Sequence, residues 1–189
     1  ANSTAHVVAM TGSYFRGDSV PILAPEDEQK FDKVSYTYYE QLEGYQYLKS
    51  FAMGYKFYRG RYTDALHEVL DTSKKTIIHI PNVNSGESTK DKYDEVDRIL
   101  DELGQAVPDP KTGLWLVTEE TGRVLKVADL VTEEGREKVQ DYLNKMTSLD
   151  DLDIIIALGM AKEGFDWPYA EYALTIGYRQ SLTEIVQII

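Results

Sequence analysis

Cysteine is absent from the 189-residue sequence. This absence excludes a disulfide framework, a thiolate metal site and a cysteine nucleophile. Long apolar runs are absent as well, because no stretch approaches the roughly 20 apolar residues that a membrane-spanning helix needs. With 42% hydrophobic and 28% charged residues, the composition is typical of a globular protein, and we expect a cytoplasmic location without a membrane partner.

Positive charge is scarce, since the formal net charge is -12. Residues 1–80 hold 9 Lys and Arg against 10 Asp and Glu, whereas residues 81–189 hold 11 against 22. Nucleic-acid binders usually carry a basic face, because the neutralisation of phosphates supplies most of their affinity. The charge therefore argues against an independent nucleic-acid-binding domain, but it is compatible with a domain that contributes a few contacts to a shared groove.

Several motifs that carry chemistry are also missing. No G-x-x-x-x-G-K-[ST] phosphate loop occurs, and no G-x-G-x-x-G follows a predicted strand. His6, His67 and His79 are far apart and lack ligand spacing, so no metal site is expected. The serines lack a nearby base, so nucleophilic catalysis is not supported. The run Asp94-Glu95-Val96-Asp97 resembles an acidic Mg²⁺ box by its letters, but its place in an amphipathic helix favours a solvated face.

From residue 62 onward, predicted strands alternate with predicted helices. Strands are expected over residues 75–81, 114–117, 123–127, 154–158 and 172–176. Helices are expected to follow the candidate caps Thr63, Ser88 or Thr89, Thr132 and Ser181. This alternation predicts an α/β domain with a central, mainly parallel sheet flanked by helices. Residues 1–60 are expected to form an extended leading segment with strands of its own, one of them over residues 49–58.

The last predicted helix stops on Val-Gln-Ile-Ile, in the middle of its apolar face and without a C-cap. A natural domain seldom ends in this way. We therefore expect the sequence to be part of a longer protein.

Residues 153–168 combine a buried strand with a polar exit. The run Ile154-Ile155-Ile156-Ala157-Leu158 is short and rich in β-branched residues, which predicts a strand buried on both faces. Gly159, Gly164 and Asp166 follow it. Open parallel sheets bind ligands at the carboxyl ends of their strands, where a glycine allows close approach and a carboxylate accepts hydrogen bonds. The alternative is an ordinary strand-to-loop exit.

Two further strand exits carry polar groups. Residues 81–86 offer the amides of Asn82 and Asn84, the hydroxyl of Ser85 and backbone N–H groups, which suit a phosphate oxygen near a helix N-terminus. A simple turn with an N-cap is the alternative. Arg179 follows the last predicted strand and could pair with Asp166 or reach a phosphate, or it could be exposed to solvent.

Basic and aromatic residues alternate between residues 49 and 62. The basic members are Lys49, Lys56, Arg59 and Arg61, and the aromatic ones are Phe51, Tyr55, Phe57, Tyr58 and Tyr62. Such a mixture can bind single-stranded nucleic acid by stacking and charge. At strand spacing the aromatic side chains could instead serve the core.

The order of these features resembles the motif order of superfamily 2 DEAD/DEAH-type helicases. Met10-Thr11-Gly12-Ser13 looks like motif III, and residues 76–85 resemble motif IV. Residues 157–168, with Glu163-Gly164-Phe165-Asp166-Trp167-Pro168, are similar to motif V of helicases related to the type I and type III restriction subunits. Residues 179–189 resemble the approach to motif VI.

This resemblance implies a RecA-like (P-loop NTPase-like) fold in two parts. Residues 1–30 would be the end of a first RecA-like domain with its linker, and residues 31–189 would form the second RecA-like domain, truncated at its C-terminus. In the complete enzyme, ATP and Mg²⁺ would sit between the two domains and nucleic acid would cross both.

The resemblance also assigns roles to single residues. Contacts between the domains would come from Thr11, Gly12 and Ser13. Contacts to nucleic acid would come from Asn82, Asn84, Ser85 and Gly159. The ATP cleft would be lined by Gly164, Asp166, Arg179 and Gln187.

Three parts of the helicase pattern are missing from this sequence: the phosphate loop, the acidic box and the arginines of motif VI, which stabilise charge on the transferred phosphoryl group. The sequence therefore contains no catalytic residue, and we expect neither ATPase activity nor a tightly bound cofactor from it alone. The expected partners are nucleic acid, with DNA favoured over RNA, the first RecA-like domain, and a nuclease or methylase.

Two other classes of function stay open. A non-catalytic α/β module could bind a phosphorylated small molecule through residues 81–86. A structural interaction domain would need no ligand at all.

Overall fold

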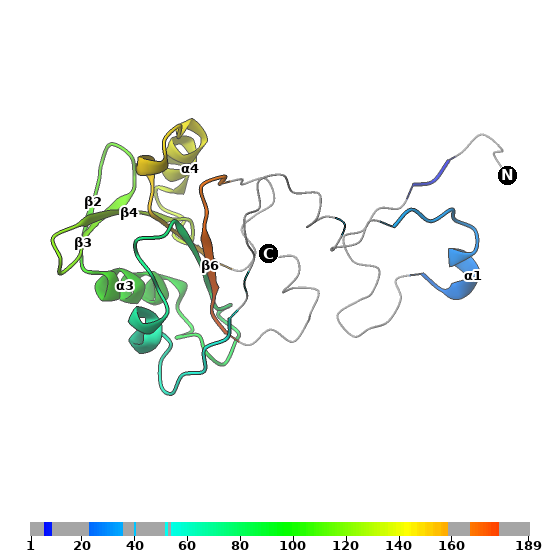
Figure 1. The fold of residues 1–189 in the computed structure, drawn as a ribbon, viewed down its shortest axis with the longest axis horizontal. Helices are drawn as coiled ribbons and strands as arrows, with labels where there is room; N and C mark the ends of the chain where they lie inside the picture. Colours follow the sequence, from blue (N-terminus) through cyan, green and yellow to red (C-terminus); the bar gives the residue numbers. More distant parts are fainter. Residues whose placement is uncertain are drawn as a thin grey trace. The chain divides into compact units, whose positions relative to one another are not determined.

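The computed structural model describes residues 6–8, 23–35, 40, 52, 54–158 and 167–177 (Figure 1). The chain divides into two units: Lys56–Tyr178, and Ala1–Tyr55 together with Arg179–Ile189. The unit that contains the N-terminus has one short described helix, α1 (Pro25–Glu28), with proline in its first turn. Lys30 pairs with Asp27 at 2.7 Å there. The predicted boundary between residues 30 and 31 stays a prediction.

The unit Lys56–Tyr178 is built on one six-stranded sheet. Its strands are β1 (Thr76–Ile80), β2 (Gln105–Pro108), β3 (Trp115–Thr118), β4 (Val124–Asp129), β5 (Ile154–Leu158) and β6 (Tyr172–Thr175). They lie in the order β2-β3-β4-β5-β1-β6. Strands β4, β5, β1 and β6 pair in parallel, whereas β2 and β3 pair antiparallel at one edge. The predicted α/β class with a mainly parallel sheet is confirmed.

Apolar side chains cover both faces of this sheet, and Figure 1 shows α3 (Lys92–Leu103) and α4 (Arg136–Lys145) on opposite sides of it. On one face, Ile154 and Ile156 of β5 pack with the apolar side of α3. On the other, Ile155 and Ala157 pack in the cluster that contains the apolar residues of α4. Because side chains alternate along a strand, β5 serves both layers, and the predicted two-sided burial of residues 154–158 is confirmed.

The helices begin later than the candidate caps predicted. Asp91 caps α3 by accepting a 2.9 Å hydrogen bond from the Tyr93 amide, since the chain turns at Lys90 (φ 75°) after Ser88 and Thr89. Gly135, not Thr132, precedes α4. The Asp129 carboxylate accepts a hydrogen bond from the Thr132 backbone amide, which keeps Thr132 in a turn before the helix. The helix predicted after Thr63 is a 3-10 helix, η1 (Thr63–Glu68), not an α-helix. Residues 54–58 are not a strand either.

An ion pair and a hydrogen bond connect neighbouring strands near their amino ends. Lys75 Nζ lies 2.8 Å from the Asp153 carboxylate, and both side chains are almost completely buried. The same carboxylate accepts a 2.9 Å hydrogen bond from the Lys126 amide. Asp153 therefore joins the starts of β1, β4 and β5.

Within the described ranges, no helix is both long and apolar enough to cross a bilayer.

Helix α3 carries a row of acidic side chains that should reduce its stability. Partial burial, and then the negative charges of Asp101 and Asp94, raise the pKa of Asp97. A carboxyl whose pKa is higher in the folded state favours the unfolded state when ionised. We therefore expect Asp97→Asn to raise the free energy of unfolding at neutral pH by roughly 0.5 kcal/mol, the size of an exposed like-charge pair on a helix.

The gain should shrink as the pH falls through the folded-state pKa and vanish below about pH 4, where the carboxyl is protonated in both states. Urea denaturation at several pH values measures it. Asp141→Asn on α4 is the control, because Asp141 pairs with Lys145 at 2.6 Å and its loss should slightly destabilise. A loss of stability in Asp97→Asn at neutral pH would contradict the argument.

Candidate functional site

The carboxyl ends of the four parallel strands meet at one edge of the sheet. These ends are Asp129 of β4, Leu158 of β5, Ile80 of β1 and Thr175 of β6. Loops that leave this edge form the usual ligand crevice of open α/β sheets. The ends of β1, β5 and β6 therefore lie at the same edge of the sheet.

Only part of the predicted site can be placed. Asn82, Asn84 and Ser85 lie in the loop between β1 and α3, residues 81–91, which we term the β1–α3 loop. The other predicted site residues lie outside the described residues and stay predictions; they are Thr11, Gly12, Ser13, Gly159, Gly164, Asp166, Arg179 and Gln187.

The β1–α3 loop is held in shape by its own side chains. The Asn82 side-chain oxygen accepts a 2.9 Å hydrogen bond from the backbone N–H of Asn84. The Asn82 backbone carbonyl accepts one of 2.8 Å from the backbone N–H of Ser85. The Lys90 ammonium donates to the Ser85 carbonyl. Asn82 therefore forms the turn, whereas the exposed Asn84 side chain is available to a ligand.

Ser85 differs from its neighbours in the loop. Its hydroxyl is buried and has no hydrogen-bond partner among the described residues. An unpaired buried hydroxyl is costly unless a partner is supplied. The predicted contact between Ser85 and a phosphate needs this hydroxyl to turn outward, so Asn84 is the better placed of the two.

The end of β6 packs closely on the start of this loop. A Cβ added to Gly177 (φ +97°) would lie 3.6 Å from Pro81 Cβ and 3.5 Å from a carboxylate oxygen of Glu87. The Glu87 carboxylate thus lies beside the chain that follows β6. Burial, and then the charges of Glu87 and Glu95, raise the pKa of the Tyr58 hydroxyl, so this group stays protonated beside the two carboxylates.

Glu95 is a buried residue next to the candidate site that the sequence pattern did not single out. Its side chain is fully buried, and its two oxygens accept hydrogen bonds from the Tyr62 hydroxyl and, at 2.6 Å, from the Thr89 amide. Burial and the bond to Glu95 raise the pKa of Tyr62 and keep it a donor. The predicted solvated face is therefore wrong at this position. The sequence does contain a pattern that indicates burial of Glu95, because Ile99 and Leu103 follow it at intervals of four residues on the same buried face of α3.

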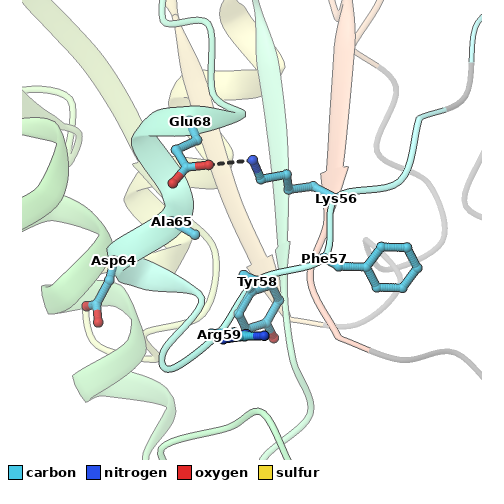
Figure 2. Close-up of a pocket in the computed structure, with 7 residues that line it drawn as sticks. All are labelled: Lys56, Phe57, Tyr58, Arg59, Asp64, Ala65 and Glu68. Atoms are coloured by element: carbon cyan, nitrogen blue, oxygen red, sulfur yellow. Dashed lines mark ion pairs between the residues drawn. The ribbon is translucent and has the colours of Figure 1, made fainter.

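The basic and aromatic segment divides between core and surface. Tyr62 is buried in the core and Tyr58 packs against it, whereas Phe57 is 92% exposed. Figure 2 shows Lys56 paired with Glu68 across a hollow of about 300 Å³, with Phe57 pointing away from that pair. The core interpretation is therefore confirmed for Tyr58 and Tyr62, whereas binding of nucleic acid by the exposed residues stays a prediction. No group of acidic and histidine side chains suited to a metal ion occurs within residues 54–158 and 167–177 or the other described positions.

Comparison with known proteins gives one informative similarity. The chain is 69% identical over 191 aligned residues to the Bacillus subtilis (strain 168) protein named "Putative ATP-dependent helicase YeeB". The alignment covers 100% of this chain but 32% of that protein, so the chain spans about a third of its relative's length. No protein-family model matches the chain, and no solved structure matches it.

Proposed function

We propose that this chain is the second RecA-like domain of an ATP-dependent superfamily 2 helicase or translocase of the restriction type. In the complete protein it supplies half of an ATP cleft and part of a nucleic-acid groove. The observation that carries the proposal is the 69% identity, along the whole chain, to a relative whose name states an ATP-dependent helicase. The motif order in the sequence and the mainly parallel sheet support it independently.

The residues that can be placed do not form an ATP site by themselves. The sequence has no phosphate loop, and the described residues hold no cluster for Mg²⁺. We therefore assign no catalytic step to this chain. Its role in the proposed enzyme is to present the β1–α3 loop and the cleft residues Gly164, Asp166, Arg179 and Gln187 to ATP and nucleic acid bound with the first domain.

The β1–α3 loop is the proposed contact to the nucleic-acid backbone, with DNA favoured over RNA. Asn84 offers an exposed amide beside backbone N–H groups, and these are donors that phosphate oxygens accept. Glu87 and the net charge of -12 work against strong phosphate binding. We therefore expect weak, salt-sensitive binding by the chain alone.

Replacement of Asn84 with alanine tests this contact. Asn84→Ala removes the exposed amide but keeps the turn, because only the backbone N–H of Asn84 is used in it. One lost hydrogen bond should lower the affinity for single strands roughly fivefold. Fluorescence anisotropy of a labelled strand measures this effect, and raising salt from about 50 to about 200 mM should weaken the wild type further. Asn144→Ala, on the exposed side of α4, is the matched control.

Two results would count against the proposal. Binding of a sugar phosphate without binding of oligonucleotides would favour the small-molecule module. ATP turnover by the purified chain would refute the assignment of the phosphate loop and arginines to the rest of the protein. The complete protein should hydrolyse ATP faster when single strands are present.

A further inference from the structure

The segment at residues 56–62 presents one aromatic ring to solvent in an unusual way. Phe57 is 92% exposed, whereas Tyr58 beside it packs on the core and Tyr62 is 5% exposed within it. An exposed phenylalanine of this degree contributes nothing to the core. It is also flanked on both sides by basic residues, Lys56 and Arg59.

Three interactions attach this segment to the rest of the unit on both sides of Phe57. Lys56 pairs with Glu68 of η1, Tyr58 packs on the core, and the Tyr62 hydroxyl donates to the buried Glu95. Tyr58 packs on the core, whereas Phe57 and Arg59 on either side of it are exposed, and Figure 2 shows the Phe57 ring pointing away from the Lys56–Glu68 pair. Because the backbone on both sides of Phe57 is attached, the segment loses less conformational entropy when it binds a partner.

The charges around Phe57 select the kind of partner. Residues 49–62 hold four basic residues and no acidic one, within a chain of net charge -12. The hollow beside Phe57 also holds Asp64 and Glu68, and Glu68 neutralises Lys56. Arg59 is exposed and makes no ion pair among the described residues. The exposed groups are therefore the Phe57 ring and the Arg59 guanidinium. Proteins that bind single-stranded nucleic acid use such a ring to stack on a base and such a basic group to contact a phosphate.

The segment is also connected to the β1–α3 loop. Glu95 accepts from Tyr62 at the end of the segment and from the Thr89 amide in the loop. The buried Glu95 carboxylate is thus hydrogen-bonded to both the β1–α3 loop, which is proposed to contact the nucleic-acid backbone, and the segment that carries Phe57.

We infer that Phe57 is a base-stacking residue for single-stranded nucleic acid, with Arg59 contacting the adjacent phosphate. This inference rests on the proposed function and extends it, because it names a base contact where the loop offers only backbone contacts. It requires the strand to be single, since the bases of a duplex do not expose their faces.

Two strands of equal length separate stacking from charge: an oligothymidylate, and an abasic strand that has the phosphates without the bases. With the whole chain, Phe57→Ala should bind the oligothymidylate roughly tenfold more weakly and the abasic strand as well as the wild type does. Phe57→Leu should behave like Phe57→Ala, and Phe57→Trp should restore binding. Arg59→Ala should weaken both strands and lower the salt dependence by about one phosphate contact.

Leu149→Ala, at another exposed apolar position, and Lys111→Ala, at another exposed basic one, are the controls and should bind both strands normally. Equal affinity of wild type and Phe57→Ala for the oligothymidylate would overturn the stacking role. It would leave the proposed function intact, because Asn84→Ala and strand-stimulated ATP hydrolysis by the complete protein test that separately. A wild-type dimer in sedimentation velocity that Phe57→Ala dissociates would also overturn the inference, since the ring would then cover another copy of the chain.

Discussion

Gly104→Ala should strongly destabilise the sheet unit, with a loss of about 4 kcal/mol. Gly104 follows helix α3 with φ +145° and ψ -155°, a backbone conformation open mainly to glycine. A Cβ there would lie 2.2 Å from the Thr118 carbonyl oxygen and 3.2 Å from the Glu119 Cα. Both are backbone atoms at the end of β3, so no flexible side chain can move aside.

The consequence follows from where Gly104 lies. It joins α3 to β2, and β2 pairs with β3. Relief of the clash must move the helix away from the sheet or separate the two strands. Because a domain of this kind is stable by only about 5–15 kcal/mol, the variant should unfold at a much lower urea concentration, which circular dichroism of the whole chain measures.

Gly122→Ala provides the matched control. Gly122 also has a positive φ, +84°, but nothing lies within 4 Å of an added Cβ at this turn. This variant should therefore lose only about 1 kcal/mol from the left-handed conformation. Equal losses in both variants would show that conformation alone, not contact with β3, explains the effect.

The central strands could be predicted because their sequence pattern depends on burial. Five consecutive apolar residues in β5 favour a strand covered on both faces, and β1 was predicted in the same way. Strand β2 was missed because Gln105–Pro108 is largely exposed at the sheet edge and pairs with β3 alone. An edge strand of that kind carries no burial pattern to read.

Local contacts that depend on backbone direction could not be predicted. Asp91 caps α3 instead of Ser88 or Thr89 because Lys90 adopts a positive φ, which lysine seldom does. Phe57 and Tyr58 are adjacent in sequence, yet one is exposed and the other packs on the core. The residue types suggested both a binding surface and a core, and only the fold assigns each ring to one of them.

Glu95→Ala should lower the free energy of unfolding by roughly 3 kcal/mol, because it leaves one buried and one partly buried donor without an acceptor. These donors are the Tyr62 hydroxyl and the Thr89 amide. Asp94→Ala is the control one residue away. Asp94 pairs with Arg98 at 2.8 Å on the helix surface, and because solvent screens such a pair its loss should change the stability little. Urea denaturation of the whole chain compares the two.

The same substitution should weaken nucleic-acid binding for a reason separate from stability. At temperatures where Glu95→Ala is still folded, the β1–α3 loop and the Phe57 segment have each lost their attachment to α3, so both proposed contacts must be ordered on binding. Tyr62→Phe removes only the attachment of the Phe57 segment. It should therefore reduce the preference for an oligothymidylate over an abasic strand, whereas Glu95→Ala should weaken both. If folded Glu95→Ala bound both strands like the wild type, Glu95 would be a core residue with no part in positioning the site.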